Sequence, residues 1–136
     1  MIKKNSKSNH LTGKEYEIMK ILWASDRPLL IADLVENCEN IAFNSLHPTI
    51  KKLIEKGFIK IVGNMRVVKT LSRLYAPNVS VDEYAAMQLD EIMRATNKKL
   101  NLNNVMTSFT KIRHNNRDEI LSEITEFVKT YSEEKN

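Results

Sequence analysis

With 136 residues, the chain is long enough for one ordinary domain or for a small domain with an appendage. Its content of 42% hydrophobic and 28% charged residues is typical of a globular protein and excludes a disordered chain. Three Gly and three Pro are too few turn residues for an all-β sandwich. No apolar run could cross a bilayer and no secretory signal is visible, so we expect a mainly α-helical, cytoplasmic protein without membrane insertion.

The net charge of +4 is unevenly distributed. Residues 1–77 carry 13 Lys and Arg against 7 Asp and Glu, whereas residues 78–136 carry 8 against 10. This asymmetry indicates that only the first part meets a polyanion. The lysine-rich residues 1–10 are expected to form a disordered basic arm.

Two helices are expected after this arm. Thr12 and Glu15 form a capping box that opens the first, and apolar residues at helical spacing continue it to about Ala24. After a break at residues 26–28, a shorter helix follows with Cys38 on its apolar face. We interpret Cys38 as a small core residue and not as a redox sensor.

A third helix is expected to begin at Asn44 and Ser45, which both offer an N-cap, and to stop at Gly57. If Ser45 is the cap, Pro48 is the third helical residue, where its missing N–H leaves no intrahelical bond unmade. The inner face of this helix is apolar, with Leu46, Ile50, Leu53 and Ile54.

A β-hairpin is predicted next. Residues 58–62 are rich in β-branched side chains, Gly63-Asn64 signals a turn, and β character resumes at residues 66–68 and 73–76. Three helices followed by a two-stranded hairpin are the element order of a winged helix-turn-helix domain. We place this DNA-binding domain at residues 11–78.

The third helix and the hairpin, or wing, carry the candidate DNA contacts. A recognition helix buries one face in its domain and lays the other in the major groove. Short polar groups near its start can read base edges, and lysines can reach phosphates or guanine acceptors. The candidate DNA-binding residues are Ser45, His47, Thr49, Lys51 and Lys52 on the helix, and Lys60, Arg66, Lys69 and Arg73 on the wing.

Residues 79–136 are predicted to form a three-helix dimerisation domain. Its amphipathic stripes cannot all be buried by so few residues, so they must pack on the wing domain or on another chain. A palindromic operator requires a two-fold protein, which favours a homodimer over a monomer with an intramolecular helical cap. The candidate dimerisation residues are Tyr84, Ile92, Leu102, Val105, Met106, Phe109, Ile120, Ile124, Phe127, Val128 and Tyr131.

Three segments carry a family resemblance. They are LTGKEYEIMKILW at residues 11–23, TIKKLIEKGFI at residues 49–59, and LYAPNVSVDEY at residues 74–84. In this order and at this spacing, they resemble the penicillinase-repressor (BlaI/MecI) family of winged-helix transcriptional repressors.

This resemblance implies a homodimeric repressor of β-lactam-resistance genes. Such a repressor leaves double-stranded DNA when a membrane sensor protease responds to antibiotic and the repressor is cut within its tail. The matching cleavage position in this chain is Ser108–Phe109, where the family usually has Asn before Phe.

No pattern typical of an enzyme, a metal site or a cofactor site is present. His10, His47 and His114 are far apart and have no Cys or carboxylate at metal-ligand spacing. Neither a phosphate-binding loop nor a nucleophile motif occurs, so we expect no catalytic residue, metal or cofactor. Two alternatives to the repressor stay open: a winged-helix regulator with a small-ligand trigger, and a protein-interaction module whose lysines are merely solvated.

Overall fold

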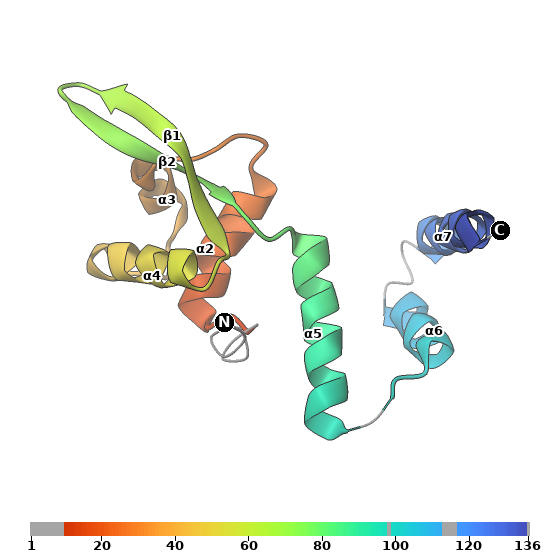
Figure 1. The fold of residues 1–136 in the computed structure, drawn as a ribbon. Coiled ribbons are helices and arrows are strands. Elements are labelled where there is room, and N and C mark those ends of the chain that lie inside the picture. The colour runs from red at the N-terminus through yellow and green to blue at the C-terminus, as the bar shows by residue number, and fades with distance from the viewer. Residues whose placement is uncertain (1–9, 98, 113–116, 136) are drawn as a thin grey trace. The chain divides into compact units, whose positions relative to one another are not determined.

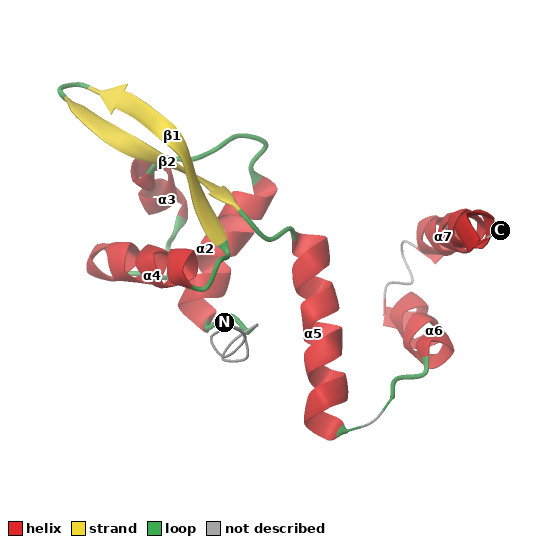
Figure 2. Ribbon diagram, in the orientation of Figure 1, coloured by secondary structure: helices red, strands yellow, loops and turns green. Residues whose placement is uncertain are grey.

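The computed structural model describes residues 10–97, 99–112 and 117–135, and for residue 117 and residues 131–135 it describes the backbone alone. The chain divides into two compact units, residues 1–94 and 95–136. Figure 1 shows the order of the elements, and Figure 2 shows one hairpin among helices. The predicted fold class, mainly α-helical with a small two-stranded sheet, is confirmed. The arm expected at residues 1–10 falls almost entirely outside the described residues.

Three helices with a shared apolar core form the base of the first unit. They are α2 (Gly13–Ala24), α3 (Ile31–Asn37) and α4 (Phe43–Glu55). Burying each large apolar side chain contributes about 1.5–3 kcal/mol, and this holds the three helices together. The buried apolar positions are Ile18, Met19 and Leu22 in α2, Leu34 in α3, and Leu46, Ile50 and Leu53 in α4.

The capping box predicted at the start of α2 is present. Thr12 Oγ1 accepts a hydrogen bond from the Glu15 amide at 3.3 Å, and Glu15 Oε1 accepts one from the Thr12 amide at 2.9 Å. The Glu15 side chain is only 3% exposed and also forms an ion pair with Lys56 Nζ at 2.6 Å. The cap of α2 is therefore tied to the residue that ends α4.

The start of α4 differs from the prediction. The expected cap, Ser45, lies inside the helix; Ala42 is the N-cap, and Pro48 is the sixth helical residue instead of the third. In this position Pro48 lacks the N–H that would donate to the carbonyl of Asn44. One missing bond in the first two turns is tolerated because the buried face from Leu46 onward holds the helix against the core.

The end of α4 agrees with the prediction. Gly57 has a φ of 86°, a left-handed conformation that glycine adopts without steric cost. The Phe58 amide donates to the Leu53 carbonyl at 2.9 Å, and the Gly57 amide donates to the Ile54 carbonyl at 3.0 Å. This pair of bonds is a Schellman motif, which turns the chain directly into the hairpin.

The hairpin consists of the antiparallel strands β1 (Ile59–Val67) and β2 (Thr70–Pro77). The turn expected at Gly63-Asn64 is wrong, because both residues lie within β1 and the chain reverses at Val68-Lys69. The pairing register shifts between Ile61 and Gly63, which leaves the residue between them as a β-bulge.

The register of the hairpin is set at its base, where Tyr75 belongs to the core. Tyr75 is 6% exposed and exchanges backbone hydrogen bonds of 2.9 and 2.8 Å with Leu29. A two-residue turn at residues 63 and 64 would pair Ile59 with Val68 and would leave Tyr75 out of the sheet. Core packing therefore overrides the local Gly-Asn turn signal.

The helix α5 (Val81–Thr96) opens with a capping box formed by Ser80 and Glu83. Tyr84, in its first turn, packs against the rings of Trp23 and Phe58 at centroid distances of 5.6 and 5.8 Å. Trp23 Nε1 also donates to the backbone carbonyl of Val79 at 2.8 Å. The start of α5 is thereby fixed to the first unit, while the domain boundary expected after residue 78 stays a prediction.

The second unit contains α6 (Leu102–Ile112) and α7 (Arg117–Lys135), which contact each other. Both have an apolar stripe, but none of their described side chains is buried. Among the described residues, no helix is long and apolar enough to cross a membrane.

Candidate nucleic-acid interface

The outer surface of α4 is polar and partly basic. It lies opposite the buried Leu46, Ile50 and Leu53, so core packing determines which side chains face outward. The early helix start adds Asn44 to this surface, a residue that was interpreted from the sequence as part of a cap. Asn side chains can pair with adenine edges. The exposed members are Asn44, His47, Pro48, Lys51, Lys52 and Glu55.

Two of the predicted DNA-binding residues, Ser45 and Thr49, are half-buried on the flank of α4. The Thr49 hydroxyl donates to the Ser45 carbonyl at 2.7 Å. The Ser45 hydroxyl accepts a hydrogen bond from Lys14 Nζ, on α2, at 3.4 Å. The Thr49 hydroxyl therefore donates within the chain, whereas the Ser45 hydroxyl only accepts. The bond to Ser45 brings Lys14, which was not predicted as a DNA contact, to this flank.

The four predicted wing residues do not share one surface. Side chains alternate between the two faces of a strand, and cross-strand partners lie on the same face. By this register Arg66 and Arg73 lie on one face and Lys60 lies on the other, while Lys69 is in the turn. The bulge at Val62 produces this arrangement, because unbroken alternation would have placed Arg66 on the same face as Lys60.

The cations of α4 and the wing are exposed and belong to no ion pair of the described residues. Among the described residues, each ion pair of a lysine or arginine involves Lys20, Arg27, Lys56 or Arg94. None of the six basic residues predicted to contact DNA belongs to such a pair, namely Lys51, Lys52, Lys60, Arg66, Lys69 and Arg73. Such a surface attracts a polyanion.

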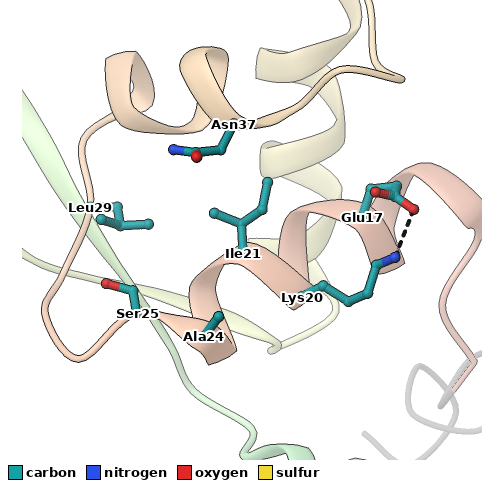
Figure 3. Close-up of a pocket in the computed structure, with 7 residues that line it drawn as sticks. All are labelled: Glu17, Lys20, Ile21, Ala24, Ser25, Leu29 and Asn37. Carbon is teal, nitrogen blue, oxygen red and sulfur yellow. Dashed lines mark ion pairs between the residues drawn. The ribbon is translucent and has the colours of Figure 1, made fainter.

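A hollow between α2 and α3 has no comparable character. Figure 3 shows Ile21, Leu29 and Asn37 facing into it, with Glu17 and Lys20 at its edge. The two charged residues neutralise each other in an ion pair of 3.0 Å. The hollow therefore offers no unpaired charge with which to hold a ligand.

Cys38, at the end of α3, is half-buried. Burial raises the pKa of its thiol above the ordinary value, and the nearby Glu17 carboxylate raises it further. A thiol that keeps its proton is a poor nucleophile and a poor metal ligand. Among the described residues, no group of three or more His, Cys, Asp and Glu side chains could hold a metal ion.

The predicted dimerisation residues fall into two sets. Tyr84 and the exposed Ile92 belong to the first unit, and the ring of Tyr84 packs within its own chain. In the second unit, a groove of about 580 Å³ lies between α6 and α7. Val105, on α6, is half-buried but does not line this groove. The side chain of Tyr131 lies outside the described residues. The predicted residues that line the groove are Leu102, Met106, Phe109, Ile120, Ile124, Phe127 and Val128.

The proposed cleavage position lies in the middle of α6. Ser108 is exposed, and Phe109 is 44% exposed while it lines the groove.

Comparison with known proteins agrees with the winged-helix geometry. The family model described as penicillinase repressor matches residues 11–129, which include all three helices of the core, the hairpin and most of the tail. No curated protein matches the chain. Because the family model covers most of the sequence, the chain belongs to the penicillinase repressor family, a family of transcriptional regulators.

Proposed function

We propose that the chain represses transcription as a homodimer bound to a two-fold symmetric operator in duplex DNA. The observation that carries this proposal is the uncompensated basic surface of α4 and the wing, on an element order typical of DNA readers. The outer surface of α4 enters the major groove, where Asn44, His47 and Lys51 meet base edges. Arg66 and Arg73, on one face of the wing, contact the sugar–phosphate backbone.

Dimerisation occurs through the second unit. The groove between α6 and α7 is lined mainly by apolar side chains, and Phe127 and Ile112 are 67% and 73% exposed. Apolar surface of this kind favours association with a second apolar surface. A second copy of the same tail supplies it and gives the two-fold symmetry that a palindrome needs.

Selection from random-sequence duplex DNA tests this function. We expect the purified chain to enrich a symmetric site whose half-sites are about one helical turn apart. The double variant Lys51→Gln/Lys52→Gln should lose this enrichment. The matched control, Lys111→Gln/Lys129→Gln, removes the same charge from exposed positions of the tail and should keep it. A wild-type chain that enriches no site would overturn the proposal and favour the protein-interaction module.

We further propose that cleavage between Ser108 and Phe109 releases the repressor from genes for β-lactam resistance. A protease needs an extended substrate, so α6 must open locally. Within one chain no residue of α6 is buried, so in the dimer the contacts with the partner set the cost of this opening. The partner is a sensor protease that responds to the antibiotic. Mass spectrometry of the chain from antibiotic-treated cells should find a fragment ending at Ser108. Induction with an intact chain would instead favour a small-ligand trigger.

A further inference from the structure

A polar groove of about 390 Å³ lies between the start of α2 and the flank of α4. Lys14 contributes from α2, and Ser45 and Lys52 contribute from α4. Glu15 and Lys56 also line the groove, but they neutralise each other in their ion pair of 2.6 Å. The net charge of the groove is therefore set by Lys14 and Lys52.

Both of these lysines are exposed, and neither forms an ion pair with a carboxylate of a described residue. Lys14 Nζ reaches across the groove to Ser45 Oγ, but the distance of 3.4 Å is at the long limit of a hydrogen bond. A neutral hydroxyl at this distance leaves the charge of Lys14 uncompensated. The groove thus offers two ammonium groups and one hydroxyl donor to an anion.

We propose that this groove holds a phosphate of the DNA backbone, with Lys14 and Lys52 supplying charge and Ser45 donating a hydrogen bond. The inference rests on the proposed function, because it assumes that α4 occupies the major groove. The major groove of DNA is about 12 Å wide, and a helix with its side chains is about 10–12 Å across. The flanks of α4 therefore lie beside the DNA backbone. Ser45 and Lys52, seven residues apart, share such a flank.

The phosphate contact has a specific consequence for recognition. Contacts to phosphates set the position and angle of a recognition helix but read no sequence. Because Lys14 comes from α2, it links the orientation of the whole first unit to the DNA backbone. Lys14 is a positioning residue, and base preference is left to the outer surface of α4.

The salt dependence of binding to a random-sequence duplex tests the inference. We expect Lys14→Gln to bind about fivefold more weakly and to reduce the slope of log Kobs against log salt by about 0.9 for each bound chain. Lys14→Arg should restore both values. The matched control is Lys20→Gln, which removes the same charge from the same helix outside this groove.

Three outcomes are distinguishable. A reduced slope for Lys14→Gln with an unchanged slope for Lys20→Gln supports the phosphate site. Equal slopes for both variants would show a diffuse charge effect and would overturn the inference, while DNA binding itself stands. A wild-type chain that binds no duplex would overturn the proposed function and the inference with it.

Discussion

Replacing Glu15 by Ala should destabilise the first unit more than any other single change at a helix start. The Glu15 carboxylate has two partners, the Thr12 amide at 2.9 Å and Lys56 Nζ at 2.6 Å. Its side chain is 3% exposed and that of Lys56 is 22% exposed, so water compensates little when the carboxylate is removed. The change breaks a helix cap and, at the same time, the ion pair between the start of α2 and the end of α4.

The magnitude follows from these two losses. A lost cap interaction costs about 1 kcal/mol. Removing one partner of a buried ion pair costs about 3–5 kcal/mol when the other charge stays buried. Lys56 can turn its ammonium toward water, which reduces the second cost, so we expect a total of about 3 kcal/mol. In a unit of this size, that loss lowers Tm by roughly 12–24 °C.

Glu83→Ala is the matched control. Glu83 holds the same position in the capping box of α5, where its carboxylate accepts from the Ser80 amide at 2.8 Å, but it is exposed and has no ion pair among the described residues. We expect this variant to lose about 0.5–1 kcal/mol. Urea unfolding followed by the fluorescence of Trp23, the single tryptophan, measures both. Equal losses for the two variants would refute a stabilising role for the Glu15–Lys56 pair.

Three further predictions have defined outcomes. Val68→Gly should stabilise the chain by about 1 kcal/mol in thermal melts, because a β-branched residue at a φ of 57° is strained and glycine is not; a lower Tm would contradict this. Tyr84→Phe should cost about 1 kcal/mol, because it removes the hydroxyl that accepts from the Leu11 amide at 3.2 Å. Tyr84→Ala also removes the ring and should cost about 3 kcal/mol. Urea unfolding measures both losses, and equal losses would show that the ring does not anchor α5. Because the pKa of the Cys38 thiol is raised, its alkylation by iodoacetamide should be slower at pH 8 than that of a free thiol and should accelerate only at higher pH, and a rate at pH 8 equal to that of the free thiol would argue against burial.

Local signals in the sequence predicted the fold well where a residue type has one specific role, such as capping or ending a helix. The capping box at Thr12 and the helix stop at Gly57 are confirmed by hydrogen bonds and by a left-handed backbone angle. These signals depend on neighbours within a few residues. The Gly63-Asn64 turn and the Ser45 cap failed because contacts distant in sequence compete with them: Tyr75 with Leu29 in one case, and the core-facing side of α4 in the other.

The same limit applies to the candidate site. Residues on the outer surface of α4 follow from helical periodicity, so the lysines there could be found from the sequence. Lys14 could not, because it lies 31 residues from Ser45 and only the packing of α2 on α4 brings the two together. The division of the wing cations between two faces was also missed, because Gly63 was interpreted as part of the turn and not as the neighbour of a bulge.

The two units use apolar surface differently, and in the proposed function this difference connects dimerisation to release from DNA. The first unit buries an apolar core within one chain, with Ile18, Leu34 and Leu53 fully buried. None of the described side chains of α6 and α7 is fully buried. In the proposed dimer, the partner chain covers the groove between these helices. Once one chain of a dimer is bound, the recognition helix of the other chain is held at a high effective concentration. Binding to a palindrome is thereby about 10²–10⁴-fold stronger than that of a single chain. The proposed cut between Ser108 and Phe109 would detach α7 from its half of the groove, and this gain would be lost although no DNA contact had changed.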